Sequence, residues 1–201
     1  MGSVQINHQT GPGNHEYRLQ SGGAGYYTYF DGVPKWYSYD VGAWHMIALN
    51  SQEVLKEGSP QNNWLEQDLA ATSSDCVLAY MHYPLYTDGE YAPGLPKVRP
   101  AWADLFKARA DVALAGHDHI YARYATMNHL GTQTSVGIRS FVVGTGGKSH
   151  YTQSTTTRTA LEHIETQDFG VLKLTLHDGS YDWQFVNESG AVLDSGTAAC
   201  V

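Results

Sequence analysis

Residues 111–119 read DVALAGHDH: a short apolar run, then a glycine, then two histidines separated by one aspartate. A continuous apolar run of this length is typical of a strand buried on both faces of a sheet. Residues 76–84, CVLAYMHYP, repeat the arrangement, because their apolar run ends at Met81 and His82 follows at once. Two buried strands that each lead into a histidine predict a sheet with a candidate site at the carboxyl ends of its strands.

A helix is expected before each of these strands. Ser59 provides an N-cap with Pro60 at the first helical position, and apolar residues recur at helical spacing as far as Ala71. Residues 100–107 carry the second helical pattern. The alternation of helices and strands predicts an α/β layered sheet, in which ligands bind beyond the carboxyl ends of the strands.

Shorter patterns extend this fold in both directions along the chain. Two aromatic and aliphatic runs at 35–40 and 43–50 predict a hairpin, and residues 138–143 predict a strand that enters the turn GTGG. After a Thr-rich loop at 154–159, the tail alternates apolar and polar residues and predicts an antiparallel meander. Its strands are expected at residues 171–176, 181–186 and 192–193.

Composition favours one folded domain over residues 1–201. The chain carries 12 Lys and Arg against 20 Asp and Glu, a net charge of −8, and only 16% of its residues are charged. A negative chain without a Lys or Arg block argues against a nucleic-acid partner. No apolar run reaches the ~20 residues of a membrane span, and the first residues lack a signal-peptide pattern. We therefore expect no membrane partner and no export signal in this chain.

The two cysteines, Cys76 and Cys200, have neither the spacing of a metal site nor that of a redox motif. Two unpaired thiols, with Cys76 in the core, are the favoured interpretation, and a single disulfide between them is the alternative. Low charge with abundant Tyr, Thr, Ser, Gly and Asn favours an extracellular protein.

Three short motifs bring ligand-type side chains into turns: GNHE at 13–16, HYP at 82–84 and GHDH at 116–119. Together they provide one asparagine and four histidines, a set that suits a borderline or hard divalent ion. In an extended HxH segment the two side chains point the same way, so they can address one ion or two neighbouring ions. An isolated HxH is more often incidental, but the three motifs together predict a metal site. The candidate residues are Asn14, His15, His82, His117 and His119.

These motifs resemble those of the calcineurin-like metallophosphoesterases and, within them, the purple acid phosphatase-like secreted bacterial phosphatases. The likeness extends from about Thr10 to Cys200. It is carried by PGNHEY (12–17), YSYDVGAWHMIALNS (37–51), GSPQNNWLEQDLA (58–70), LAYMHYPLY (78–86), AGHDHIYAR (115–123), GIRSFVVGTGG (137–147) and FGVLKLTLHDGSYDWQFV (169–186). The resemblance implies an α/β/β/α sandwich that ends in the antiparallel meander.

The resemblance also implies a site with two metal ions, which clamp a phosphate ester and activate a bound water. Asn14, His82 and His117 match the family's ligands for one ion, and His119 matches a ligand for the other. His15 matches the catalytic histidine that contacts the phosphoryl group and helps to protonate the leaving oxygen. The residues implied to support these ligands are Glu16, Asp118, Tyr121 and Arg123.

Other aromatic residues and histidines have both structural and functional interpretations. Tyr83, Tyr86 and Tyr91 follow His82 and are candidate walls of a substrate pocket, although such residues also pack for ordinary reasons. His45 lies within a strand-like run and is expected to be structural. The histidines of polar or Gly-rich loops, which are candidates to replace a missing ligand, are His8, His150 and His163.

The family pattern includes two further N-terminal motifs, an Asp motif and a GDxxY-type motif whose aspartate bridges the two ions, and this sequence contains neither. The resemblance therefore implies an N-terminally truncated sandwich. The missing strands would leave an apolar face exposed, which a homo-oligomer could cover.

The expected function is that of a metal-dependent phosphoric ester hydrolase acting on a small-molecule phosphate ester. One or two ions of Zn, Fe or Mn are the expected cofactors, and an extracellular location follows from the resemblance. Two alternatives stay open: a remnant that binds one metal ion without catalysis, and a metal-dependent enzyme repurposed for a non-phosphate substrate.

Overall fold

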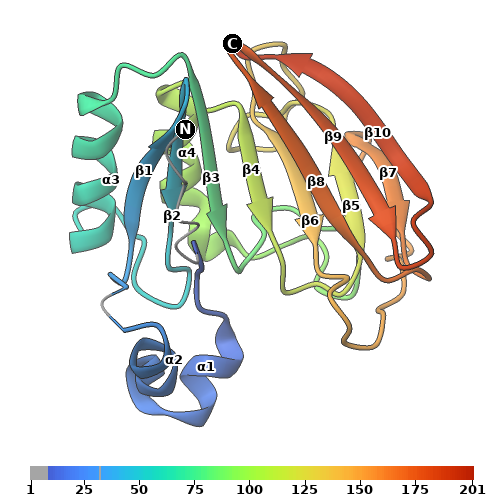
Figure 1. The fold of residues 1–201 in the computed structure, drawn as a ribbon, viewed down its shortest axis with the longest axis horizontal. Coiled ribbons are helices and arrows are strands. Elements are labelled where there is room, and N and C mark those ends of the chain that lie inside the picture. The colour runs from blue at the N-terminus through green and yellow to red at the C-terminus, as the bar shows by residue number, and fades with distance from the viewer. Residues whose placement is uncertain (1–8, 32) are drawn as a thin grey trace, which may run out of the picture.

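The computed structural model describes residues 9–31 and 33–201. They form three layers, and the middle layer is a seven-stranded sheet (Figure 1). Helices α3 (Pro60–Ala71) and α4 (Arg99–Lys107) cover one face of this sheet. A three-stranded antiparallel sheet packs against the other face, over strands β2 to β6. This α/β/β order provides three of the four layers of the expected α/β/β/α sandwich. No helix within the described residues covers the outer face of the smaller sheet.

The large sheet has the strand order β1-β2-β3-β4-β6-β5-β7. Strands β2, β3, β4 and β6 are parallel, whereas β1 runs antiparallel to β2 and β5 runs antiparallel to both of its neighbours. The strand bounds are β1 Tyr37–Val41, β2 Trp44–Ala48, β3 Cys76–Met81, β4 Val112–Ala115, β5 Tyr121–Tyr124, β6 Arg139–Val143 and β7 Leu161–Glu165. The short helices α1 (Asn14–Leu19) and α2 (Ala24–Tyr29) lie near the carboxyl ends of the parallel strands.

Most of the expected elements are confirmed. The hairpin forms β1 and β2, with Gly42 at a φ of 60° in its turn. In α3 the Ser59 hydroxyl accepts a hydrogen bond from the Asn62 amide at 3.4 Å, and Pro60 is the first helical residue. The meander forms β8 (Gly170–His177), β9 (Ser180–Asn187) and β10 (Val192–Ala199).

Among the described α-helices and strands, four were not expected: α1, α2, β5 and β7. Two short 3-10 helices, η1 (Ser21–Gly23) and η2 (Pro96–Val98), were not expected either. The GNHE motif, expected in a turn, instead begins α1 at Asn14. Neither α1 nor α2 contains a buried residue, so neither leaves an apolar periodicity in the sequence.

The two sheets are joined by an aromatic core and by a buried ionic contact. Tyr121 of β5 stacks on Phe185 of β9 with ring centroids 4.1 Å apart. Its hydroxyl donates to Asp194 Oδ2 at 2.6 Å. Arg123 donates to both carboxylate oxygens of Asp194, at 2.7 and 3.1 Å, so β5 is tied to β10 by a bidentate ion pair.

The favoured interpretation of the cysteines is wrong, because Cys76 and Cys200 form a disulfide with their Cα atoms 5.5 Å apart. The bond joins the start of β3 to the residue that follows β10. Asp111 lies beside it and accepts hydrogen bonds from the amides of Val77 and Val201 at 2.8 and 2.7 Å. A separation of 124 residues hides this proximity in the sequence, and only the packing of the two sheets creates it.

Among residues 9–31 and 33–201, no helix combines the length and the apolar character needed to cross a bilayer.

Candidate metal site

Segments that are far apart in the sequence meet at the carboxyl edge of the large sheet. Asn14 and His15 open α1, His82 follows β3, and His117 and His119 follow β4. β3 and β4 are adjacent and parallel, so the residues after them emerge on the same side. This is the edge at which α/β sheets bind ligands.

Three of the expected ligands converge on one point. Asn14 Oδ1 lies 2.8 Å from His82 Nε2, and His82 Nε2 lies 3.2 Å from His117 Nδ1. Two atoms bound side by side to one ion at about 2.1 Å are about 3 Å apart. The amide oxygen and the two imidazole nitrogens therefore fit a common cation.

Gly13 permits this convergence. A Cβ atom on Gly13 would lie 2.8 Å from Cε1 and 2.9 Å from Nδ1 of His82, closer than such atoms can approach. Glu16 fixes the same turn, because its Oε2 accepts a hydrogen bond from the Gly13 amide at 2.7 Å. Glu16 thus contacts the backbone that carries Asn14.

The backbone of His117 is strained. Its φ of 65° lies in the left-handed region, which residues with a Cβ seldom adopt. The Gly116 amide donates to the His82 carbonyl oxygen at 3.1 Å, so the two histidine segments are held together just before this residue. Strain of this kind persists where the surrounding structure enforces it, and it clusters at functional sites.

Burial keeps the two central imidazoles neutral. Burial, together with a smaller contribution from the neighbouring histidines, lowers the pKa of His82 to about 4 and that of His117 to about 4. A neutral imidazole has the free lone pair that a metal ion requires. Both side chains are therefore in the ligand form at neutral pH.

His119 is oriented by its second ring nitrogen. Nδ1 donates to the Ser149 carbonyl oxygen at 2.9 Å, and the ring stacks on Tyr151 with centroids 4.1 Å apart. This arrangement leaves Nε2 available as a ligand, as is common for metal-binding histidines.

Asp118 is fully buried and organises the loop above the site. It accepts hydrogen bonds from the Thr87 hydroxyl at 2.5 Å and from the amides of Glu90 and Tyr91 at 3.2 and 3.4 Å. The Tyr91 ring consequently lies 4.2 Å from the His117 ring, measured between centroids.

A cavity of about 480 Å³ opens over these groups. It brings together four expected residues beyond Asn14, namely His15, His82, His117 and His119, and its rim includes Tyr91. Sequence reasoning missed three lining residues with polar side chains, Arg18, Lys148 and Tyr151. Lys148 follows the GTGG turn directly, and a cation beside a glycine-rich turn at a strand end was the available signal.

The remaining expected residues do not line this cavity. Tyr83 contacts both central histidines, with ring centroids 5.3 Å from His82 and 4.5 Å from His117. Tyr86 as a pocket wall is wrong: it is 2% exposed, packs on Trp102, and its hydroxyl donates to the Asn128 carbonyl oxygen. The described side-chain contacts of Tyr121 and Arg123 include Asp194 of β10 and none of the expected metal ligands.

The other histidines have separate surroundings. His45 is buried, with its ring nitrogens 2.8 Å from Asp40 and 2.9 Å from Asp68, which agrees with a structural role. His150 stacks on Phe169, and His163 Nδ1 lies 3.8 Å from an Asp194 oxygen. His8 lies outside the described residues.

The α1–α2 segment is attached to the sheet by polar contacts. The Asn50 side-chain amide donates to the hydroxyls of Tyr17 and Tyr27, both at 2.9 Å. The Tyr17 hydroxyl in turn donates to Glu53 at 3.0 Å. Asn14 and His15 are therefore held in place by tyrosine hydroxyls rather than by a buried apolar face.

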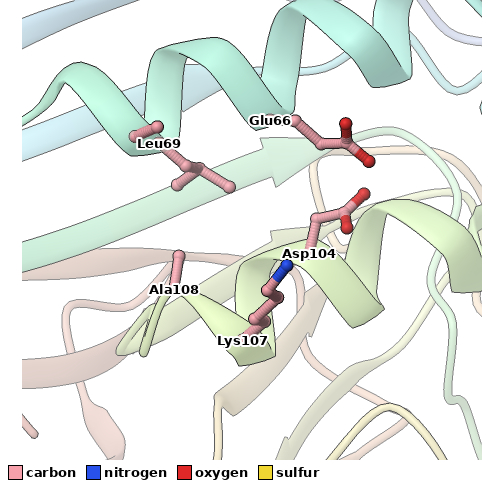
Figure 2. A pocket seen from close by; sticks show the side chains of 6 residues that line it. Glu66, Leu69, Asp104, Lys107 and Ala108 are labelled. Carbon is pink, nitrogen blue, oxygen red and sulfur yellow. The ribbon is translucent and has the colours of Figure 1, made fainter.

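A second cavity, of about 260 Å³, lies between α3 and α4 on the helical side of the sheet (Figure 2). Glu66 and Asp104 point toward each other across it, and the Asn62 amide donates to both at 3.3 and 2.9 Å. Burial raises the pKa of Asp104. This cavity lacks histidines and does not adjoin the candidate metal site.

Comparison with known proteins gives a family and a fold. The profile of the family described as "Calcineurin-like phosphoesterase" matches residues 6–121. "Purple acid phosphatase 22" of Arabidopsis thaliana is 28% identical over 79% of this chain and 38% of its own length. A "Nucleotide pyrophosphatase/phosphodiesterase" of Hordeum vulgare is 27% identical over 81% of this chain and 50% of its own.

Among solved structures, a purple acid phosphatase from yellow lupin (Lupinus luteus) seeds has a similar fold. The TM-score is 0.76 at 24% identity, over 82% of this chain and 32% of that one. The chain thus spans between about a third and a half of the length of these proteins.

Proposed function

The chain belongs to the calcineurin-like phosphoesterase family, and from that premise we propose that it is a metal-dependent hydrolase of small-molecule phosphate esters. The proposal depends on the convergence of three ligand atoms. His82 Nε2 lies 2.8 Å from Asn14 Oδ1 and 3.2 Å from His117 Nδ1. The similarity to purple acid phosphatases supports it.

In this proposal Asn14, His82 and His117 hold one ion, and His119 contributes to a second. Amide oxygen and imidazole suit zinc, iron or manganese. When bound, such ions lower the pKa of a coordinated water and neutralise charge on the phosphoryl group. His15, which lines the same cavity, donates a proton to the leaving oxygen and so avoids release of an unstable alkoxide.

Metal analysis and turnover of p-nitrophenyl phosphate test the proposal together. We expect close to two ions per chain and measurable turnover. His82→Ala should lose an ion and reduce turnover about a hundredfold or more, because it removes the central one of the three ligands of that ion.

A matched control is His177→Ala. His177 is about half exposed and its Nε2 contacts Asp182, away from the cavity, so this variant should keep both metal and turnover. Bound metal without turnover of any phosphate ester would contradict hydrolysis, and protein without bound metal would contradict every metal-based function.

A single-ion, non-catalytic site is the second candidate, and one observation favours it. No aspartate or glutamate is among the described residues that line the cavity, whereas two-ion hydrolases clamp their substrate between two closely held ions. One ion per chain and no turnover in the same assay would support this candidate. Turnover of a non-phosphate substrate that depends on His117 would instead support a repurposed enzyme.

We also propose that the protein works in an oxidising, extracellular setting. The Cys76–Cys200 disulfide supports this, because such bonds persist outside the reducing cytosol. Chain isolated from culture fluid should show no thiol that alkylates without prior reduction. A fully alkylated chain would contradict the proposal.

A further inference from the structure

Two positive side chains line the candidate metal cavity without a partner. Arg18 and Lys148 are exposed, and neither side chain has an ion pair or hydrogen bond in the described part of the chain. No described acidic residue lines the same cavity. The chain has a net charge of −8, yet this cavity has two positive side chains and no carboxylate. Such a local excess of positive charge favours the binding of an anion.

Helix α1 determines where Arg18 lies. Residues three and four apart share one face of a helix, so Arg18 lies on the face that carries His15 and Asn14. It is one turn, about 5 Å, further along the helix than the ligand. Arg18 is therefore placed to contact a group beyond the one at the metal ions.

Lys148 lies in the segment that follows β6, and hydrogen bonds hold this segment before and after Lys148. Thr145 is buried and its hydroxyl donates to the Gly170 carbonyl oxygen at 2.9 Å. The next residue after Lys148, Ser149, accepts the hydrogen bond from His119 Nδ1. Lys148 is thus anchored beside His119, while Arg18 is anchored beside Asn14.

We propose that Arg18 and Lys148 form a second anion subsite, which selects phosphate esters whose leaving group carries a further anionic group. The inference rests on the proposed hydrolase function. A cavity of about 480 Å³ has room for a small organic ligand and not only for one phosphoryl group. The planar guanidinium of Arg18 matches a phosphate or carboxylate in two-point contact, and Lys148 adds a second charge.

Titration calorimetry on the metal-loaded protein tests this subsite. It compares inorganic phosphate with methylenediphosphonate, which carries two anionic groups and resists hydrolysis. We expect the wild type to bind the bisphosphonate about tenfold more tightly than phosphate. Arg18→Gln and Lys148→Gln should each reduce this ratio severalfold with unchanged metal content.

The variants keep every metal ligand, so the metal ions contribute equally to anion binding in all of them. Lys56→Gln is the matched control, because Lys56 is exposed and outside the cavity, and it should keep the wild-type ratio. Phosphonoacetate in place of the bisphosphonate shows whether the second group is recognised as a phosphate or as any anion.

An equal ratio in the wild type and both cavity variants would overturn the subsite. The binding ratio needs no turnover, so the two proposals fail separately. A ratio that depends on Arg18 and Lys148 in a protein that hydrolyses no ester would remove the proposed function and leave the subsite in place.

Discussion

Gly13 occupies a narrow contact in the metal site, between the segment that begins α1 and the ring of His82. Its φ is ordinary, so the requirement for glycine comes from space and not from backbone conformation. Any side chain at this position pushes Asn14 and His82 apart. The distance between two ligands of one ion is therefore controlled by a residue that binds nothing.

Gly13→Ala should weaken metal binding by about 10- to 100-fold, the usual effect of disturbing the groups that orient ligands. Stability should change little, because α1 contains no buried residue. Metal titration and thermal unfolding of the same samples measure both. Gly11→Ala is the control, since nothing lies within 4 Å of a Cβ there. Equal metal affinity in the two variants would refute the role of Gly13.

At the scale of elements, His45 joins the β1–β2 hairpin to α3. Its ring contacts Asp40 at 2.8 Å and Asp68 at 2.9 Å, and the Ser38 hydroxyl donates to Asp68 at 2.6 Å. Burial disfavours the charged imidazole, but the two carboxylates outweigh it, so the pKa of His45 is raised. The protonated ring thus links two acidic side chains.

This link predicts a pH dependence of stability. A histidine whose folded pKa exceeds the unfolded value of about 6.5 stabilises the fold fully below that pH, and the contribution disappears as pH rises through the folded pKa. The urea midpoint of the wild type should therefore fall relative to His45→Gln as the pH rises above about 6.5, the unfolded value. His177→Gln should retain the wild-type dependence, and parallel curves for wild type and His45→Gln would disprove the link.

The elements that sequence predicts best are those with the most buried residues. β3 has five buried positions among its six, and an apolar run of that kind has few other interpretations. The histidines after β3 and β4 were predictable for the same reason, because a strand end fixes where they emerge. α1 and α2 were not, since contacts through hydroxyls leave no hydrophobic pattern.

Side-chain roles were harder to predict than positions. Tyr86 follows the His82 motif closely, yet its ring turns into the core toward Trp102. Arg123 is close in sequence to His119 but pairs with Asp194, 71 residues away. Both outcomes depend on packing between distant segments, which a local motif does not encode.

At the scale of the whole molecule, the disulfide closes the chain around both sheets. It lies at the start of β3, whereas His82 lies just beyond the end of that strand. The bond therefore restrains the fold from the side opposite the metal site.

Reduction of this disulfide should lower stability by about 2–5 kcal/mol, given the long loop that it closes. For a chain of this size the melting temperature should fall by about 10 °C. Thermal unfolding with and without a dithiol measures the change. A Cys76→Ala, Cys200→Ala double variant should be indifferent to the dithiol, and a wild type that is equally indifferent would show that the bond adds no stability.

The polar attachment of α1 and α2 gives the metal site a gradient of local stability. His82 and His117 follow core strands, which unfold only with the whole protein. Asn14 belongs to a segment that can detach from the sheet once a few hydrogen bonds to tyrosine hydroxyls break. Amides of residues 14–29 should therefore exchange with solvent faster than those of 76–81, and bound metal should slow them selectively. The ligands would then bind the ion in order, the imidazoles of His82 and His117 first and the amide oxygen of Asn14 last.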